Sequence, residues 1–523
     1  MPENLISLFQ YLEKEDINID KIEFEYQIQS HPDYPSLLSI ADTLSFFNID
    51  NGALRVDISE IDLLPYRFIA LLSEGNNNSQ LTFIENKNGK YYCTNDKKTI
   101  KKTRLELEKL WKDTVLLVEK PEYEATPTKK NNWSNFLPVL CLGLLSFTLL
   151  QLDSTLQSKL FLLFPVIGFL FSIAALKDLF DAKSELINNF CNITSSTSCN
   201  TIVDSSKWKI FEIVSFSDLS ITFFTTQFIG LILFLFIVNG TEFFSLQQIL
   251  LFCSVPVLVV SIYFQKFVER KWCPICLAII AVVLLELVYL IIFIKPDFNF
   301  SINSIIHLGF LFSSILMIWF GLKKLLIKQK ELKEFQIKAN RFIRNYSNFK
   351  NTLLTKEKTE LPFTPIILGN PESKTHITMM TNPFCGHCEA THEILDKILE
   401  KKGQDLQIKI IIKTDLSNES DENKLFFQNL MEVYLENGAL AFGEVLKNWF
   451  ENKNVKNWLK IHQIENINIP KIEAVYNTHS NWCVTNNFSF TPTIFVNGYQ
   501  FPDSFERDNL PNFINDLIED EDF

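Results

Sequence analysis

The stretch Asn382-Pro383-Phe384-Cys385-Gly386-His387-Cys388 decides the fold of the last third of the chain. A strand is predicted immediately before it, over 376–381, and a helix immediately after it. The N-terminus of a helix favours a thiolate over a thiol, so Cys385 is expected to be reactive, and His387 should add to that effect. Cys388 follows one turn later and can close a tight disulfide with Cys385. Because stabilising the reduced form makes a disulfide more oxidising, the sequence predicts a redox-active pair.

This segment resembles the thioredoxin superfamily, with the Cys-Gly-His-Cys variant typical of disulfide isomerases. A second match is Phe490-Thr491-Pro492-Thr493, which resembles the loop whose cis proline, here Pro492, faces the active site in that family. Residues 360–523 fit the DsbA-like, α/β variant of the fold, which has a helical insert. A zinc site using the two cysteines and a nearby histidine, His387 or His392, is the alternative, although zinc sites ordinarily pair two such motifs. The other strands predicted in this part cover 366–368, 408–413 and 493–496.

The composition divides the chain into parts of different character. Its 523 residues suit about three domains. A net charge of −12 and a pI near 5.3 argue against a nucleic-acid partner. The first and last parts are mixed and polar, whereas the middle is nearly all apolar. The opening twenty residues are polar and acidic and do not have the pattern of a signal peptide.

The middle part contains six apolar runs that are long enough to span a bilayer. They cover roughly 134–151, 159–176, 219–238, 246–264, 274–294 and 303–322. A basic amphipathic stretch from Lys323 to about Lys350 follows them and is predicted to be a connecting helix. We therefore predict an all-α, multi-pass transmembrane bundle over 133–325 and a basic linker helix over 326–359.

Two further cysteine pairs belong to this membrane part. Cys273-Pro274-Ile275-Cys276 stands at the head of the fifth run, where its spacing puts both sulfurs on one helix face. Cys191 and Cys199 lie in the longest connection, on the same side of the membrane by helix parity. Taken alone, either pair could be inert buried cysteine, but an attached thioredoxin-like domain favours redox chemistry. No redox role is expected for the other four cysteines, Cys93, Cys141, Cys253 and Cys483.

This arrangement resembles the vitamin K epoxide reductase family in its bacterial form, which is fused to a thioredoxin-like domain. The match rests on Cys191, Cys199, the following Asn200-Thr201-Ile202-Val203-Asp204-Ser205 and the Cys-Pro-Ile-Cys run, all within 155–325. The family has a shuttle pair in its first long loop, a serine six residues after the second shuttle cysteine, and a Cys-x-x-Cys at the head of its fourth bundle helix. The loop pair is more widely spaced here than is usual in the family.

The resemblance implies an order of electron transfer from a substrate dithiol. Cys385, once reduced, attacks the shuttle disulfide at Cys199, and Cys191 then reduces the Cys273–Cys276 disulfide. Each exchange needs a thiolate and passes through a mixed disulfide. The full order is Cys385/Cys388, then Cys199/Cys191, then Cys273/Cys276.

The resemblance also implies an electron acceptor inside the bundle, a quinone that would be menaquinone or ubiquinone. Cys276, the deeper sulfur, would deliver electrons to it, and Ser205 would hydrogen-bond its carbonyl. The alternative for Ser205 is a solvated loop serine. No metal is expected, and the implied partners are the membrane quinone pool and secreted or periplasmic thiol proteins.

Residues 1–125 are predicted to form a soluble domain of helices and strands. Helical patterning covers 23–47, and strands are expected at 68–72, 81–85 and 114–119. The domain resembles the α+β, papain-like peptidase domain of peptide exporters that cleave double-glycine leaders. The match rests on His31-Pro32-Asp33-Tyr34-Pro35-Ser36-Leu37-Leu38, the later strand pair, and Leu110-Trp111-Lys112-Asp113 before the last strand.

The catalytic residues of that peptidase family are missing. No cysteine precedes Cys93, and Gln80 stands where the family's histidine would begin a strand. Without a thiolate–imidazole pair no thiol-protease mechanism is available. We therefore predict a pseudopeptidase that binds a peptide or a partner and does not cleave it.

Charge and chemistry disagree about which membrane face carries the relay. Six spans put both soluble domains and all three cysteine pairs on one side, and disulfide formation favours an oxidising, extracytoplasmic side. The positive-inside rule instead points to the cytoplasm, because basic residues flank that same side: Lys129, Lys130, Lys266, Arg270, Lys271, Lys323 and Lys324. Only Lys159 and Lys295 lie at the edges of the opposite loops. If 134–151 does not span, the N-terminal domain is cytoplasmic and the redox face is outside. We expect an extracytoplasmic redox face in the cytoplasmic (inner) membrane, on grounds of function.

The sequence thus predicts a quinone-dependent thiol oxidase that makes protein disulfides. One alternative is a transmembrane thiol reductant pump, which would need a cytosolic thioredoxin and no quinone. Another is a peptide-export accessory in which the pseudopeptidase is the working part. Replacing Cys276 by serine would leave function intact in the last case and abolish it in the first.

Overall fold

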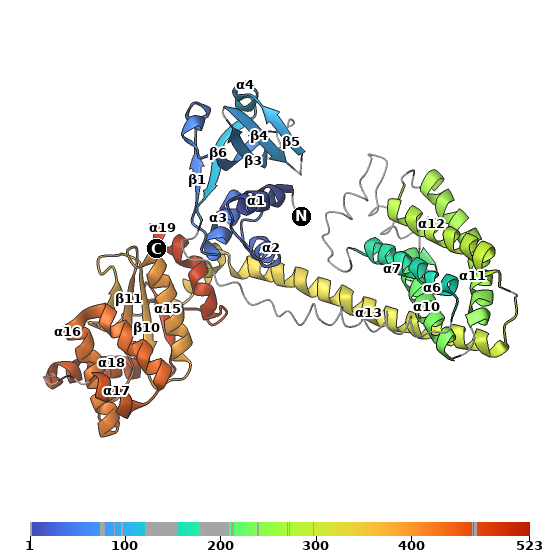
Figure 1. The fold of residues 1–523 in the computed structure, drawn as a ribbon. Coiled ribbons are helices and arrows are strands. Elements are labelled where there is room, and N and C mark those ends of the chain that lie inside the picture. Colours follow the sequence, from blue (N-terminus) through green and yellow to red (C-terminus); the bar gives the residue numbers. More distant parts are fainter. Residues whose placement is uncertain are drawn as a thin grey trace. The chain divides into compact units, whose positions relative to one another are not determined.

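The computed structural model describes residues 3–120, 154–177, 179, 209–210 and 214–523, apart from short gaps at 74–78, 88, 96–97, 238–239, 269, 271, 297, 463 and 465–467. The chain divides into two compact units, one made of 1–18 and 48–335 and the other of 19–47 and 336–523. Figure 1 colours the elements in chain order.

The N-terminal part is a six-stranded sheet, on which α1 (Glu3–Lys14) and the short α4 (Arg104–Glu108) pack. The strands are β1 (Asn51–Arg55), β2 (Arg67–Ser73), β3 (Ser79–Lys87), β4 (Lys90–Asn95), β5 (Lys98–Lys102) and β6 (Trp111–Val118). Every neighbouring pair is antiparallel, in the order β1-β6-β2-β3-β4-β5. The three predicted strands are confirmed as β2, β3 and β6. The papain-like fold expected for this domain stays a prediction.

The patterned segment 23–47 forms two helices, α2 (Lys21–Gln29) and α3 (Leu37–Phe46). They are separated by Pro32 and Pro35, which lack the backbone donor that a continuous helix needs. α3 begins after Ser36, whose hydroxyl accepts the N–H of Ser39 at 3.1 Å. The two helices belong to the second unit, where Arg341 Nε donates to the carbonyl of Gln29 at 2.5 Å.

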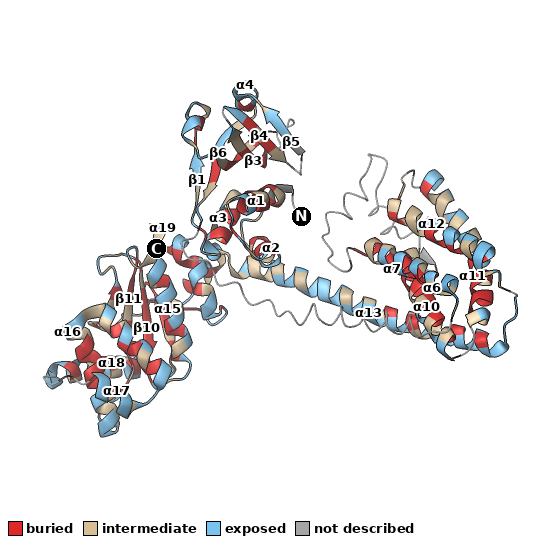
Figure 2. Ribbon diagram, in the orientation of Figure 1, coloured by how far each residue is buried: buried red, intermediate tan, exposed pale blue. Residues whose placement is uncertain are grey.

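The bundle contains five helices that are long and apolar enough to cross a membrane, among the described residues. They are α6–α7 (Leu156–Leu160 and Leu163–Ala175), α10 (Phe216–Ile237), α11 (Gly240–Tyr263, ending in a π-helical turn, Phe264–Val268), α12 (Pro274–Tyr289, ending in a second one, Leu290–Ile294) and α13 (Ile302–Ile343). In the most apolar stretch of each helix, only 17% to 44% is buried within the bundle. Most of the surface of these helices is therefore available to lipid (Figure 2). The chain therefore fits a multi-pass membrane protein. The predicted span 134–151 lies outside the described residues.

Close contacts hold the bundle helices together. Gly168 of α7 faces the ring of Phe224 on α10, and a methyl group at Gly168 would come within 2.3 Å of that ring. At the start of α10, the fully buried carboxylate of Asp218 accepts the indole N–H of Trp319 at 2.9 Å and the ammonium of Lys323 at 2.6 Å. These contacts join α10 to the apolar half of α13.

The last span and the predicted linker form one helix. α13 runs without interruption from Ile302 to Ile343, through the basic stretch that was expected to begin a separate connecting helix at Lys323. A short helix, α14 (Tyr346–Leu353), follows it. At 42 residues, α13 is about 63 Å long, roughly twice the thickness of a hydrocarbon core.

The C-terminal part is built on a five-stranded sheet in the order β13-β12-β10-β11-β9. Its elements are β9 (Ile367–Gly369), β10 (His376–Thr381), α15 (Cys388–Lys402), β11 (Gln407–Ile412), α16 (Asp421–Asn452), α17 (Val455–His462), α18 (Ile469–Thr485), β12 (Thr493–Val496), β13 (Tyr499–Gln500) and α19 (Ile514–Glu519). β10 and β11 are parallel and joined by α15, whereas the other pairs are antiparallel. This is the predicted α/β arrangement, with the helical insert α16–α18 between its halves.

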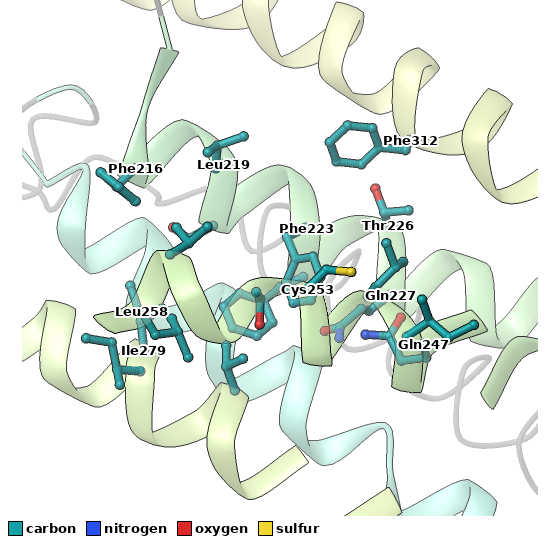
Figure 3. A pocket seen from close by; sticks show the side chains of 18 of the residues that line it. Phe216, Leu219, Phe223, Thr226, Gln227, Gln247, Cys253, Leu258, Ile279 and Phe312 are labelled. Carbon is teal, nitrogen blue, oxygen red and sulfur yellow. The ribbon is translucent and has the colours of Figure 1, made fainter. Parts of the chain in front are cut away.

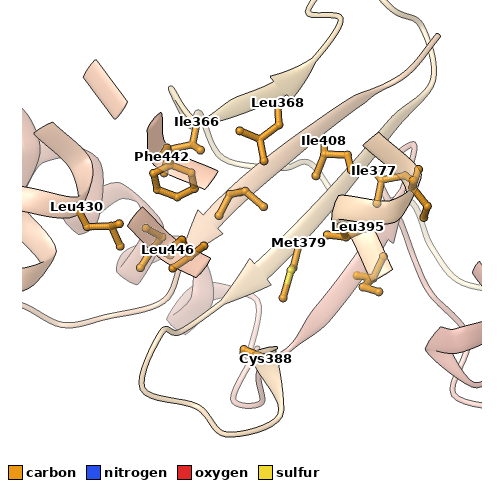
Figure 4. Close-up of a cluster of buried hydrophobic side chains, with 14 of the residues drawn as sticks. Ile366, Leu368, Ile377, Met379, Cys388, Leu395, Ile408, Leu430, Phe442 and Leu446 are labelled. Carbon is orange, nitrogen blue, oxygen red and sulfur yellow. The ribbon is translucent and has the colours of Figure 1, made fainter. Parts of the chain in front are cut away.

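A dense apolar core fixes the position of the cysteine pair in this part. Ile377, Met379 and Ile408 point from β10 and β11 toward Leu395 of α15, and the labelled side chains of Figure 4 form one cluster. Cys388 is fully buried at the edge of the same cluster. The sheet and helix thereby hold the first turn of α15 in place.

Candidate functional site

The head of α12 places the first cysteine pair of the described residues. Cys273 is the N-cap of the helix, and its sulfur accepts the backbone N–H of Cys276 at 3.3 Å. Pro274 occupies the first turn, where a missing N–H costs nothing. The backbone N–H of Cys273 donates to Oε1 of Gln265 at 3.0 Å, and Gln265 comes from the π-helical turn that ends α11. Hydrogen bonds from the end of α11 and the first turn of α12 thus hold this cysteine pair in place.

The two sulfurs of this pair differ in access. Cys273 is fully buried against Ala175 and Ile275. Cys276 is half-buried and lines a cavity of about 700 Å³ between α10, α11, α12 and α13. Most of the lining is apolar, and Figure 3 shows Phe223, Leu258, Ile279 and Phe312 around it. A flat apolar molecule of moderate size would fit beside Cys276.

Gln227, Gln247 and Glu286 are among the polar side chains that are buried inside the bundle. Gln227 and Gln247 line the cavity from α10 and α11 (Figure 3). Nε2 of Gln227 donates to the carboxylate of Glu286 on α12. The exposed fractions of the three residues are 2%, 1% and 0%. The sequence analysis did not single them out. The signal was available, because a glutamine or glutamate inside a long apolar run is rare unless it has a function.

Several predicted site residues lie outside the described residues. They are Cys191, Cys199 and Ser205, in the long connection between α7 and α10. Their roles stay predictions.

The second cysteine pair of the described residues stands between β10 and α15. The helix begins at Cys388 and not at Cys385, so Cys385 lies in the turn before it. The turn is held by Asn382, whose side chain accepts the N–H of Phe384 at 2.8 Å and whose carbonyl accepts the N–H of Cys385 at 2.9 Å. Cys385 is half-buried and Cys388 fully buried. The more accessible sulfur is therefore that of Cys385.

Cys385 and Cys388 have different surroundings, which shift the pKa values of their thiols in opposite directions. Partial burial works to raise the pKa of Cys385, but hydrogen bonds from the Thr491 side chain and from the backbone N–H groups of His387 and Cys388 outweigh it, so the pKa lies below its ordinary value. Burial raises the pKa of Cys388. Cys385 thus has the properties of an attacking thiolate and Cys388 those of a resolving thiol. The His387 side chain is exposed, and its backbone N–H makes the contact.

The predicted proline loop lies against Cys385. The Thr491–Pro492 bond is cis, as predicted, and the sulfur of Cys385 is 3.3 Å from the carbonyl oxygen of Thr491. Arg507 donates to the carbonyl of Pro492 at 3.0 Å. The structure therefore brings together Cys385, Cys388 and Pro492.

The zinc alternative has no support among the described residues, in which no group of three or more histidine, cysteine or acidic side chains could hold a metal ion. His392 is buried, and its ring nitrogen is 3.0 Å from Thr381 Oγ1. Cys483 is buried in a cluster with Met380 and Ile411 on the sheet, as a structural thiol would be. Cys93 is buried on β4, and Cys253 lines the bundle cavity. Cys141 lies outside the described residues.

Two family profiles match the chain, one on each cysteine-bearing part. The vitamin K epoxide reductase family matches residues 159–291, and thioredoxin matches residues 363–516. No curated protein matches the chain.

Solved structures resemble the C-terminal part. BdbD from Bacillus subtilis is 16% identical, with a TM-score of 0.27, over 31% of this chain and 98% of its own. A periplasmic thioredoxin-like protein from Salmonella enterica serovar Typhimurium is 15% identical, with a TM-score of 0.25, over 29% and 90%. The thiol-disulfide exchange protein alpha-DsbA2 from Wolbachia pipientis is 15% identical, with a TM-score of 0.25, over 33% and 92%.

The family matches and the cysteine geometry agree. The profile matches contain Cys273/Cys276 and Cys385/Cys388, and each pair has one accessible and one buried sulfur. The chain therefore contains a vitamin K epoxide reductase family domain followed by a C-terminal thioredoxin-like domain, and its activity is that of a thiol–disulfide oxidoreductase.

Proposed function

We propose that the protein is a quinone-linked thiol oxidase that introduces disulfides into client proteins. The observation that carries the proposal is the position of Cys276, which lines an apolar cavity of about 700 Å³, while its partner Cys273 is fully buried and does not line it. A disulfide pair with one sulfur on such a cavity can pass electrons to an apolar acceptor held there. The domain division proposed with it is 1–125, 133–325, 326–359 and 360–523.

The cavity residues suit a quinone, which is flat and apolar and has two carbonyl oxygens. The aromatic and aliphatic side chains of the wall match the ring and its tail, and Gln227 and Gln247 offer buried amides. When bound, the quinone would supply an acceptor for two electrons and two protons. Oxidation of one dithiol to one disulfide releases that number of each, so the reaction balances without another reactant.

Electrons would reach Cys276 by successive exchanges. A client dithiol reduces the Cys385–Cys388 disulfide, and the thiolate of Cys385 attacks the loop disulfide at Cys199. Cys191 then reduces the Cys273–Cys276 disulfide. The lowered pKa and half-burial of Cys385 support its place as the attacking group. Ser205 is proposed to hydrogen-bond the quinone near Cys276.

The clients are proposed to be secreted or periplasmic thiol proteins, and the redox face to be extracytoplasmic. Disulfides persist on that side, which supports the proposal, whereas the basic residues near this face oppose it. A reporter fused after Phe523 tests it. An alkaline phosphatase fusion is expected to be active. A green fluorescent protein fusion that fluoresces would instead place the redox face in the cytoplasm.

The test of the function uses the full chain in lipid nanodiscs, a reduced dithiol peptide and a short-chain quinone. We expect quinone absorbance to fall in step with the oxidation of the peptide. Cys276→Ser should abolish this, whereas Cys93→Ala, which changes a buried thiol of the N-terminal sheet, should leave it intact. Peptide oxidation that needs no quinone, or reduction of a client by cytosolic thioredoxin, would instead support a reductant pump.

The N-terminal domain is proposed to bind a peptide or partner without cleaving it. Gln80 stands in β3, where the peptidase family has its histidine, and its Oε1 accepts from Asn95 at 2.6 Å. A neutral amide paired in this way cannot act as a general base. Incubation of the full chain with a double-glycine leader peptide should give no cleavage.

A further inference from the structure

Thr381 and His392 form a polar contact inside the C-terminal part, here called the hydroxyl–imidazole pair. Thr381 is the last residue of β10, and Nε2 of His392 on α15 is 3.0 Å from its Oγ1. The side chain of Thr381 also hydrogen-bonds the sulfur of Cys388. The exposed fractions of Thr381, His392 and Cys388 are 1%, 7% and 0%. A buried hydroxyl therefore connects the resolving sulfur to a buried ring.

The strand and the helix bring these three side chains together. Alternate residues of a strand face the same way, so Thr381 lies on the side of β10 from which Ile377 and Met379 point toward α15 (Figure 4). Cys388 and His392 are four residues apart on α15 and share one face of that helix. The hydroxyl thus lies between β10 and α15, where it reaches both the sulfur and the ring.

The direction of the two hydrogen bonds follows from the chemistry of the sulfur. A thiolate can only accept a hydrogen bond, and a hydroxyl has one hydrogen to donate. When Cys388 is ionised, the hydrogen of Thr381 therefore goes to the sulfur, and Oγ1 accepts from the Nε2–H of His392. Burial lowers the pKa of His392 to about 4, so near neutral pH the ring supplies a hydrogen bond and not a charge.

The exchange reactions need the thiolate of Cys388 twice, although burial raises the pKa of this thiol. When a client thiolate attacks Cys385, a bond forms between those two sulfurs, the Cys385–Cys388 bond breaks, and its electron pair stays on Cys388. When Cys388 later attacks Cys385 in a mixed disulfide, the Cys385–Cys388 bond forms again and the partner sulfur leaves with the electron pair. The proton that Cys388 loses before this attack is balanced by the one that the departing sulfur takes up.

We propose that Thr381 is a catalytic residue that stabilises the thiolate of Cys388 in both steps, and that His392 is a positioning residue that aims the Thr381 hydroxyl at the sulfur. A hydrogen bond to an ionised group is about twice as strong as a neutral one, so the hydroxyl favours the thiolate over the thiol. This inference rests on the exchange reactions of Cys385 and Cys388 within the proposed function and does not depend on the quinone.

The test follows a mixed disulfide on Cys385 in the reduced full chain, held in nanodiscs. Glutathione disulfide is added, samples are quenched with acid at intervals, and mass spectrometry of the peptide that contains Cys385 and Cys388 gives the amount of glutathione adduct. Thr381→Val should lengthen the lifetime of this adduct about tenfold, because Cys388 then ionises less readily. The rate at which the adduct forms should stay near that of the wild type, whereas a general loosening of the fold would change both rates.

The same strand offers a rescue variant and a matched control. Thr381→Ser keeps the hydroxyl and should restore most of the wild-type rate of adduct loss. Thr378→Val removes the same atoms from a threonine that is buried on the opposite face of β10, and whose hydroxyl has no hydrogen-bond partner among the described residues. Its adduct lifetime should match that of the wild type.

His392→Leu tests the positioning residue. Without the ring, the Thr381 hydroxyl can turn away from the sulfur, so the adduct lifetime should lengthen by a smaller factor, about two- to fivefold. An unchanged lifetime in this variant would overturn the positioning role. If Thr381→Val does not fold, judged by thermal unfolding, His392→Leu decides the whole inference.

Other results would overturn the role of Thr381 itself. They are an adduct lifetime that is unchanged in Thr381→Val, a lifetime that is lengthened as much in Thr378→Val, or no rescue by Thr381→Ser. Failure of the proposed function gives a different result, in which the wild-type chain loses the adduct quickly but does not reduce quinone with a dithiol peptide. The hydroxyl–imidazole pair would then keep its role if Thr381→Val still lengthens the adduct lifetime.

Discussion

The sulfur of Cys385 lies 3.3 Å from the carbonyl oxygen of Thr491, although 106 residues separate the two in the chain. This contact joins the turn before α15 to the proline loop before β12. The loop thereby forms one wall of the place where a second sulfur must approach Cys385. A separate interaction, the hydrogen bond of the Thr491 side chain, helps to lower the pKa of Cys385, so the acidity of this thiol depends on a residue far from the cysteine motif.

The first prediction concerns that dependence. Thr491→Val removes the side-chain hydrogen bond that helps to hold the pKa of Cys385 below its ordinary value, so the pKa should rise. A smaller fraction of thiolate at neutral pH should then slow alkylation of Cys385 by iodoacetamide about tenfold, since a hydrogen bond to a charged group is worth about 1.5–3 kcal/mol. The rate is measured against pH on the reduced full chain, by mass spectrometry of the Cys385 peptide.

Thr493→Val is the control for this experiment, because its hydroxyl donates to the carbonyl of Phe490 at 2.8 Å and not to the sulfur. Its profile should match that of the wild type. An unchanged profile in Thr491→Val would mean that the backbone N–H groups alone set the acidity.

The second prediction concerns the order of attack within the pair. In Cys388→Ser, glutathione disulfide should leave a lasting adduct on Cys385, because no second thiol displaces the glutathione. In Cys385→Ser, no adduct should form on Cys388, which is fully buried and whose pKa is raised by burial. Mass spectrometry of the two peptides reads the result. A stable adduct on Cys388 would reverse the roles assigned to the two sulfurs.

The third prediction concerns the contact between α7 and α10. Gly168→Ala places a methyl group within 2.3 Å of the buried ring of Phe224, so the helices must separate or the ring must move. We expect a loss of about 1–3 kcal/mol in stability, measured as a lower midpoint of thermal unfolding in nanodiscs. Gly321→Ala, on α13 with nothing within 4 Å, should be neutral or stabilising by up to about 1 kcal/mol. Equal effects of the two substitutions would refute the packing argument.

The fourth prediction concerns acid stability. Burial lowers the pKa of His392 from its ordinary value of 6.5 to about 4, so the folded protein keeps this ring neutral over a range in which the unfolded chain protonates it. The resulting stabilisation is complete above pH 6.5 and is lost as the pH falls toward 4. It amounts to about 3 kcal/mol. Hydrogen exchange of α15, measured in the full chain between pH 7 and pH 4, should report the loss.

His392→Gln removes the titrating ring and should reduce that dependence, at some cost in stability at neutral pH. The dependence that remains is expected from His479, whose pKa is also lowered by burial to about 4. His387→Gln, on the exposed turn just before the helix, should leave the pH dependence as in the wild type. A dependence unchanged in His392→Gln would assign the acid sensitivity to other groups.

The sequence predicted the C-terminal fold well because its signals are local. The strand 376–381 and the strand 493–496 have the predicted bounds, since both are short apolar runs between clear turn residues. Cys385 was expected at the N-terminus of the helix, whereas α15 begins at Cys388. The turn residues between β10 and Cys388 satisfy the backbone through the Asn382 side chain, and the pattern of apolar residues does not reveal such a cap.

The bundle site was predicted only in part. Cys273 and Cys276 could be found from their spacing, but Gln265 could not, because the π-helical turn that aims it at Cys273 leaves no periodic signal. Gln227 and Gln247 could each have been noticed as amides within apolar runs, but the sequence does not show that they share a cavity. They are far apart in the sequence, and only the antiparallel packing of α10 and α11 puts them in one cavity.

The buried contact of Asp218 with Lys323 has a consequence for how the protein is made. The two residues are 105 positions apart, and Trp319, the other partner of this carboxylate, also lies on α13. During translation, the first turn of α10 is therefore synthesised long before Trp319 and Lys323, the side chains that pair with the Asp218 carboxylate. An unpaired carboxylate is unfavourable in the hydrocarbon core. This end of α10 is therefore expected to stay at the membrane–water interface until α13 is synthesised. Biogenesis of the bundle thus ends with α13, and a chain cut short before Trp319 would leave the insertion machinery with an incomplete substrate.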